Sequence, residues 1–78
     1  MKSGINFGEL NNYSSIVNDS LLLNQSNFRV FKTGTIVNNR TITNNNNFTN
    51  YGIVNNNKMF LNFENAIHNN YNKFNVNT

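Results

Sequence analysis

The sequence predicts an all-β fold, a single small β-solenoid in which short strands from roughly six-residue repeats stack into coils. Three observations predict it. Apolar residues recur every six positions along much of the chain, asparagine supplies 23 of the 78 residues, and an Asn stands two residues after most of those apolar residues. An amphipathic helix would need apolar residues three and four apart, and Asn is a poor helix former.

One apolar anchor residue per repeat is expected to point into the core. Anchors are six apart from Leu10 to Phe28 and again from Ile36 to Phe48, with an eight-residue step between the two series. After Phe48 the spacing becomes irregular and reaches seven between Ile67 and Phe74. The predicted core anchors are Leu10, Ile16, Leu22, Phe28, Ile36, Ile42, Phe48, Ile53, Phe60, Ile67 and Phe74.

The asparagines that follow the anchors are predicted to form hydrogen-bonded ladders. Residues two apart in a strand face the same side, so each anchor and its Asn would point inward together. Stacked side-chain amides can donate to and accept from the next coil, which satisfies polar groups that are costly to bury. The predicted ladder residues are Asn12, Asn18, Asn24, Asn38, Asn44, Asn50, Asn55, Asn62 and Asn69, and Val30 and Val76 break the rule.

Small residues precede the first five anchors by two positions, which suits the bends between strands; they are Gly8, Ser14, Ser20, Ser26 and Gly34. We expect one domain over residues 1–78, with a lead-in at 1–9 and repeats at 10–76. A chain of this length is marginally stable alone, and it has no cysteine for disulfides. Its stability should therefore come from repeated hydrogen bonds or self-association.

The small-x-aliphatic pattern at six-residue spacing resembles the hexapeptide repeat of left-handed β-helices. Gly34-Thr35-Ile36-Val37-Asn38-Asn39 and Arg40-Thr41-Ile42-Thr43-Asn44-Asn45 are also similar to the Gly-Thr-Ile-x-Asn-Asn hexads found in tandem in large bacterial, archaeal and viral surface or fibre proteins. The resemblance covers about residues 8–76 and implies an extracellular, virion-surface or cell-surface protein. The irregular steps leave open an irregular or partly right-handed solenoid, or a cross-β stack between chains.

The sequence offers little material for catalysis. Its acidic residues are Glu9, Asp19 and Glu64, and its one histidine is His68. Glu64 and His68 are four apart and would meet on a helix, which is not predicted here. No phosphate-binding loop or nucleophile motif is present. We expect no enzyme activity, no catalytic residues, no cofactor and no metal site.

Charge and hydropathy limit the partners that can be expected. A net charge of +3 from only nine charged residues is far from the dense basic surface of a nucleic-acid binder. The longest apolar run is the three leucines at 21–23, well short of the about 20 residues that span a bilayer. We therefore expect neither a nucleic-acid partner nor a membrane span.

Solenoid architecture itself predicts self-association, because both ends of a solenoid expose strand edges that can accept another chain. The predicted function is a structural self-assembling protein, a homo-oligomer or polymer that forms part of a fibre, filament or surface layer. One alternative is a small Asn-rich accessory subunit of an organellar ribonucleoprotein or other large complex. Another is a passive module with a carbohydrate- or ice-facing β-surface, for which Thr33-Gly34-Thr35 and Thr41-Ile42-Thr43 are candidate units.

Overall fold

The computed structural model describes residues 3–77, and within them it contains twelve four-residue strands and no helix. The predicted all-β solenoid is confirmed. In chain order the strands are β1 (Ser3–Asn6), β2 (Glu9–Asn12), β3 (Ser15–Asn18), β4 (Leu21–Asn24), β5 (Asn27–Val30), β6 (Thr35–Asn38), β7 (Thr41–Asn44), β8 (Asn47–Asn50), β9 (Ile53–Asn56), β10 (Met59–Asn62), β11 (Ile67–Asn70) and β12 (Lys73–Val76). No helix in the described part of the chain is long and apolar enough to cross a membrane.

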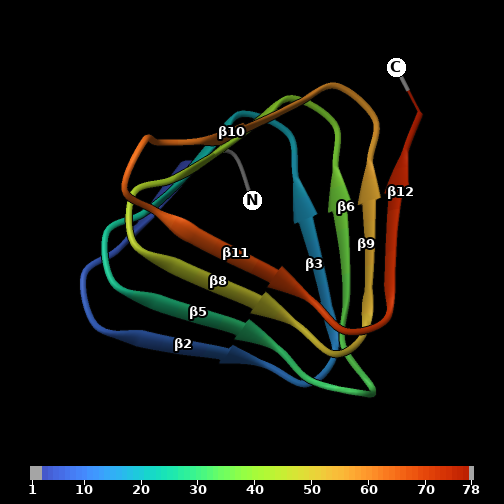
Figure 1. Cartoon of the computed structure of the whole chain (residues 1–78). Helices are drawn as coiled ribbons and strands as arrows, with labels where there is room; N and C mark the ends of the chain where they lie inside the picture. Colours follow the sequence, from blue (N-terminus) through green and yellow to red (C-terminus); the bar gives the residue numbers. More distant parts are fainter. Residues whose placement is uncertain (1–2, 78) are drawn as a thin grey trace.

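The strands form three parallel sheets, which are the three sides of a triangular coil (Figure 1). Sheet A has the order β1-β4-β7-β10, sheet B the order β2-β5-β8-β11, and sheet C the order β3-β6-β9-β12. Each coil contributes one strand to each sheet, so the chain makes four coils. Equivalent residues lie directly above one another; for example Leu22 pairs with Ile42, which pairs with Phe60.

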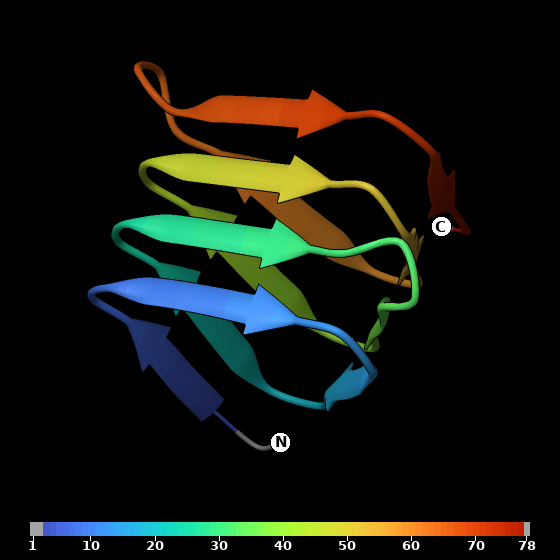
Figure 2. The same ribbon diagram turned by 90° about the horizontal axis from the view of Figure 1, so that it is seen from below.

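The solenoid is right-handed. In Figure 2 the strands of sheet B face the viewer and run from left to right, and each later strand lies above the earlier one. A front strand that runs to the right as the coil rises belongs to a right-handed helix, which is the usual hand of connections between parallel strands. The left-handed coil implied by the hexapeptide resemblance is therefore not the one that this chain forms.

A four-residue strand and a two-residue corner together give the six-residue period. Two corners are longer: residues 31–34 join β5 to β6, and residues 63–66 join β10 to β11. The period is otherwise six throughout, so along the chain the next inward residue after Phe48 is Val54, and the inward residues after the second long corner are His68 and Phe74. The predicted seven-residue spacing between the anchors Ile67 and Phe74 is therefore wrong.

Two predicted anchors and two predicted ladder residues are wrong by one position as a result. Ile53 and Ile67 begin their strands and face outward, with Ile67 51% exposed, whereas Val54 is fully buried. The ladder positions correspondingly belong to Asn56 and Asn70 in place of Asn55 and Asn69. Hydropathy favoured the isoleucines, but the pairing register of each sheet fixes which residues point inward.

The core lies along the solenoid axis and is closed in the two middle coils. Its fully buried residues are Leu22, Phe28, Val30, Ile36, Ile42, Phe48 and Val54. The Phe28 and Phe48 rings stack with their centroids 4.9 Å apart. Leu10 and Ile16 at one end and Phe60 and Phe74 at the other pack against this cluster but are only half-buried.

The described part of the expected lead-in is part of the solenoid itself. β1 pairs with β4 in register, so Gly4 lies opposite Leu22 in the core column and Asn6 lies opposite Asn24 in the ladder column. The repeats therefore begin at the first described strand and not at Leu10. Gly4 carries no apolar side chain, so the pattern of apolar anchors does not include this first unit. Residues 1, 2 and 78 of the expected domain lie outside the described residues.

Candidate functional site

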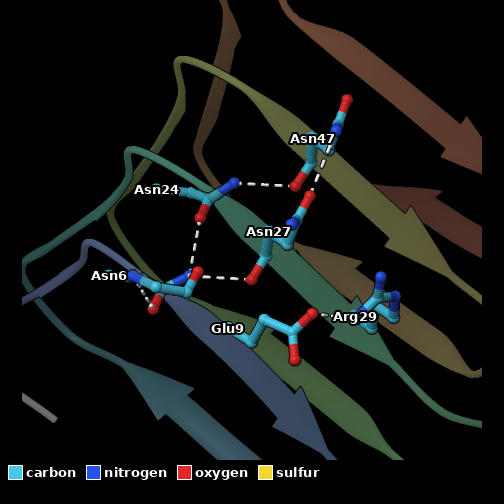
Figure 3. A network of polar contacts seen from close by, with 7 residues as sticks. Asn6, Glu9, Asn24, Asn27, Arg29 and Asn47 are labelled. Atoms are coloured by element: carbon cyan, nitrogen blue, oxygen red, sulfur yellow. Dashed lines mark hydrogen bonds and ion pairs between the residues drawn. The ribbon is translucent and has the colours of Figure 1, made fainter.

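Inward-facing asparagines form hydrogen-bonded ladders at the strand ends. At the corner between sheets A and B, the Asn6 Nδ2 donates to Asn24 Oδ1 (2.9 Å), Asn24 to Asn44 (2.8 Å) and Asn44 to Asn62 (2.8 Å), through all four coils. Figure 3 shows the first step of this ladder, between Asn6 and Asn24. The Asn ladders predicted from the repeat are thus present.

The other two corners carry shorter ladders. At the corner between sheets C and A, Asn18 donates to Asn38 (2.8 Å) and Asn38 to Asn56 (2.7 Å). Val76 occupies the fourth position of that column. At the corner between sheets B and C, Val30 separates Asn12 from the Asn50–Asn70 pair, whose amides lie 2.8 Å apart. Val30 is fully buried and extends the apolar core into this corner.

The side-chain amide of Asn38 has partners for both its nitrogen and its oxygen. Its Nδ2 donates to Asn56 Oδ1 and to the Met59 carbonyl oxygen at 2.8 Å. Its Oδ1 accepts from Asn18 Nδ2 and from the Arg40 backbone amide at 3.3 Å. In every ladder step the earlier coil donates and the later coil accepts, so the ladders are polar along the solenoid axis.

The predicted ladder residues are placed as follows. Inward ladder positions hold Asn12, Asn18, Asn24, Asn38, Asn44, Asn50 and Asn62. Asn55 and Asn69 face outward, and Asn75 Nδ2 donates to Asn55 Oδ1 on the outer surface (2.8 Å). The residues that the sequence reasoning missed are Asn6, Asn56 and Asn70. Continuing the six-residue count from Phe48 to Val54 would have found Asn56.

A second set of amides runs along the outside of the corner between sheets C and A. Asn39 Nδ2 donates to Asp19 Oδ1 (2.9 Å), Asn57 to Asn39 (2.9 Å) and Asn77 to Asn57 (3.0 Å). This outer ladder also runs through all four coils. In it the later coil donates, so its polarity is opposite to that of the inner ladders.

Four aromatic rings form a column along the corner between sheets B and C. Tyr13 stacks on Phe31 (centroids 4.3 Å apart), Phe31 on Tyr51 (6.5 Å) and Tyr51 on Tyr71 (5.0 Å). Tyr13 and Tyr71 are 60% and 65% exposed and end the column. Because the rings cover one another's faces, the free faces of this column are those of the two terminal tyrosines.

The outer surface of sheet A is apolar at both ends of the solenoid. Its outward residues include Ile5, Leu21, Leu23, Met59 and Leu61, with Thr41 and Thr43 between them. Four of these apolar side chains, Ile5, Leu21, Met59 and Leu61, are more than 40% exposed. We call this surface the apolar face. Sheet B, in contrast, presents polar groups such as Asn27, Asn47 and the Glu9–Arg29 ion pair (Figure 3).

The outer surface of sheet B carries a shallow hollow of about 180 Å³. Its lining includes Asn27, Arg29, Asn47 and Asn69, so amide and guanidinium groups dominate it. Such groups can donate hydrogen bonds to many kinds of polar molecule, and nothing in the lining selects one of them.

The structure does not bring Glu64 and His68 together. Glu64 lies on the exposed corner 63–66, whereas the His68 ring points inward and contacts the rings of Phe48, Phe60 and Phe74 (centroids 5.6, 4.8 and 4.8 Å). Burial lowers the pKa of His68 below its ordinary value of 6.5. Its buried Nε2 has no hydrogen-bond partner among the described residues. Within residues 3–77, no group of three or more His, Cys, Asp or Glu side chains is arranged to hold a metal ion.

Both ends of the described solenoid are open. Strands β1, β2 and β3 at one end, and β10, β11 and β12 at the other, each pair on one side only within residues 3–77. Figure 2 shows these two ends as the lower and upper surfaces of the stack. The ends, the apolar face and the aromatic column are the features best suited to contact with another molecule. Protein-family models, characterised proteins and solved structures were all compared with this chain, and none of them matches it.

Proposed function

We propose that this chain is a structural, self-assembling protein, a subunit or segment of an extracellular fibre, filament or surface layer. The observation that carries the proposal is the pair of open ends. Six of the twelve strands are edge strands with one side unpaired. An exposed strand edge is a template for pairing with another chain unless it is covered, twisted away or blocked by charge or proline. The chain contains no proline.

The incomplete burial of the two end coils supports the same proposal. Leu10, Ile16, Phe60 and Phe74 occupy the same inward columns as the fully buried core but remain half-buried. A second molecule stacked on either end would cover them and gain hydrophobic free energy. Solenoid proteins use terminal capping repeats with a polar outer face to stay soluble, whereas the end coils here leave these apolar residues half-buried.

The apolar face of sheet A provides a surface for lateral contact. Exposed apolar patches on soluble proteins commonly mark interaction sites. Ile5 and Leu61 lie at opposite ends of this face, so joined molecules would extend it along the polymer. Lateral pairing of such faces would turn single filaments into bundles or a layer.

The experiment is negative-stain electron microscopy of the purified chain over a concentration series, in low and moderate salt. We expect filaments of uniform width that appear above a threshold concentration, together with a β-sheet circular dichroism signal. Discrete monomeric particles at the highest concentration would overturn the proposal.

A matched pair of variants tests whether the strand edge is responsible. The Asn6 carbonyl accepts from the backbone amide of Gln25, the residue that follows β4 (2.8 Å), and successive residues in a strand direct their backbone groups to opposite sides. The Ile5 N–H therefore points away from β4, and Ile5→Pro removes a donor that the fold does not use. We expect Ile5→Pro to abolish filaments and Ile5→Ala to retain them. If both variants lose them, the apolar side chain and not the edge drives assembly.

A further inference from the structure

We infer that copies of this chain join head-to-tail in register, with β1, β2 and β3 of one copy adding to β10, β11 and β12 of the copy before it. This inference rests on the proposed self-assembly and specifies its joint. The joint would continue the right-handed solenoid from one molecule into the next. β12, the last of the described strands, lies in sheet C; in the order of the sheets the next strand belongs to sheet A, and β1 is such a strand.

The backbone hydrogen bonds repeat in a way that defines the register of the joint. At the corner after sheet A, three backbone amides donate to backbone carbonyl oxygens in the coil before. These bonds are Gln25 to Asn6 (2.8 Å), Asn45 to Asn24 (2.8 Å) and Phe63 to Asn44 (3.0 Å). The next donor in this series is the Phe7 amide of a following copy, and the next acceptor is the Asn62 carbonyl. The other two corners repeat the same pattern. The Tyr51 backbone amide donates to the Val30 carbonyl oxygen (2.7 Å), and the Asn57 backbone amide donates to the Asn38 carbonyl oxygen (2.8 Å).

Side-chain polarity makes the two ends complementary. In the inner ladders Nδ2 always donates toward the later coil, and in the last coil the Nδ2 groups of Asn62 and Asn70 donate only to carbonyl oxygens of their own corners, including those of Ala66 and Asn72 (both 3.0 Å). The inner-coil asparagines combine such a local bond with the ladder bond, as Asn44 does with Asn46 and Asn62. The first coil presents acceptors: Asn6 Oδ1 and Asn12 Oδ1 each accept only a weak local bond from the backbone, at 3.3 and 3.2 Å. Head-to-tail stacking puts donors against acceptors. A joint between like ends would put donors against donors or acceptors against acceptors.

The aromatic column also continues across this joint. Tyr71 at the last coil and Tyr13 at the first lie in the same column and each leave one ring face free, so they would stack. The outer ladder does not continue, because in it the later coil donates and the Asp19 carboxylate of the following copy has only acceptor oxygens to place beside Asn77.

The inward side chains at the two ends of the solenoid are complementary in size across the joint. The last coil presents three rings, Phe60, His68 and Phe74, and the Phe60 and Phe74 rings meet edge-to-face (5.1 Å). The first coil presents Gly4, Leu10 and Ile16 in the same columns. Gly4 leaves space over Phe60 where the inner coils have Leu22 and Ile42. The long corner 63–66 rises at this end (Figure 2) and would face Gly8, which has open space around its Cα.

Cysteine cross-linking tests the direction and register of the joint, since the chain has no cysteine of its own. Asn11 and Asn69 are exposed, lie on the polar outer surface of sheet B, away from the apolar face, and occupy the same column at opposite ends. Single variants Asn11→Cys and Asn69→Cys are mixed, allowed to assemble and treated with a short bis-maleimide. In the proposed joint these two positions are one strand spacing apart, about 4.8 Å.

We expect the mixed Asn11–Asn69 product in about tenfold or greater excess over either self-linked product, because like ends leave backbone and side-chain groups unpaired. The variant Asn11→Cys alone and the variant Asn69→Cys alone are the controls. Filaments in which self-linked products dominate, or in which no product forms, would overturn the head-to-tail joint and leave self-assembly intact. Absence of both filaments and cross-links would remove the proposed function as well.

Discussion

Asparagine at the inward end of a strand performs two tasks that an aliphatic residue could not combine. Its amide closes the corner locally, as when Asn24 Nδ2 bonds the Ser26 carbonyl (2.9 Å), and links successive coils, as when it bonds Asn44 Oδ1. Asn24 and Asn38 are completely buried. Burial strengthens such bonds and makes an unpaired partner costly, so each ladder stabilises one register only.

The residue-scale prediction for the ladder compares two adjacent asparagines. Asn38→Ala removes a buried amide, so that Asn56 Oδ1 and the Met59 carbonyl oxygen lose their side-chain donor and Asn18 Nδ2 loses one of its acceptors. We expect a loss of about 2–4 kcal/mol in the free energy of unfolding, since each unsatisfied buried group costs about 1–3 kcal/mol. Asn39→Ala, at the exposed outer ladder, should change it by less than about 0.5 kcal/mol. Urea unfolding measures both, and equal losses would contradict the assignment of these two columns.

A second residue-scale prediction concerns His68 and pH. Burial lowers the pKa of His68 in the folded chain, and the side chains facing its ring, Phe48, Phe60 and Phe74, are uncharged. The unfolded chain therefore binds the proton more tightly. Stability should be complete above the unfolded pKa of 6.5 and should fall as the pH drops below it toward the folded pKa.

The measurement is urea unfolding of the unassembled chain from about pH 8 to about pH 5.5, a range in which few other groups titrate. His68→Phe is the matched control, since a phenyl ring continues the column of Phe28 and Phe48 without a proton to bind. We expect the wild-type chain to lose stability over this range and the variant to lose much less. The same slope in both proteins would show that another group is responsible.

At the scale of elements, the sequence predicts the strands well where the inward residue is the obvious apolar one. From Leu10 to Phe48 every predicted anchor faces inward, because the six-residue spacing holds within both series and selects, for example, Leu22 from three consecutive leucines. The prediction fails where the anchor departs from that spacing. Ile53-Val54 and Ile67-His68 differ by one position, and the pairing with β6 and β8 places Val54 and His68 inward.

Corner geometry supplied a signal that the sequence reasoning did not use. With the corrected register, the small residue before each strand of sheet C is Ser14, Gly34, Gly52 or Asn72. Counting two residues back from Ile53 gives Tyr51, one residue before Gly52. Handedness and the exact outward faces depend on contacts between coils and not on any local pattern, so they could not be read from the repeat.

The element-scale prediction uses these glycines. Gly34 and Gly52 are buried at successive levels of the same corner, and a Cβ on Gly52 would overlap the carbonyl oxygens of Phe31 and Gly34. Gly52→Ala should therefore destabilise the fold by about 1–3 kcal/mol, the usual cost of overpacking. Gly8→Ala, where nothing lies within 4 Å of the added Cβ, should change stability by less than about 0.5 kcal/mol. Thermal unfolding of both variants checks this, and a tolerated Gly52→Ala would mean that the corner is looser than the structure indicates.

At the scale of the whole molecule, the solenoid is as wide as it is tall, with principal extents of 23, 23 and 21 Å. Its ends are therefore a large share of its surface, and they hold half of its strands. Three inner columns end in half-buried rings at one end and in smaller residues at the other. A molecule of these proportions gains more from continuing its stack than a long solenoid would, because so much of its core lies next to an end.

The whole-molecule prediction follows from stacking four coils per chain along one axis. Aligned filaments should give a fibre-diffraction reflection on the meridian at about 4.8 Å, the spacing of hydrogen-bonded strands, because every strand runs across the axis. A weaker repeat should appear at about 19 Å, four strand spacings, since one chain adds four coils. The two long corners, at 31–34 and 63–66, mark each chain once and make that longer repeat visible. If copies associated only through the apolar face of sheet A, the solenoids would lie side by side with no continuous axis of stacking. The strand reflection would then persist, but the four-coil repeat on the meridian would be absent.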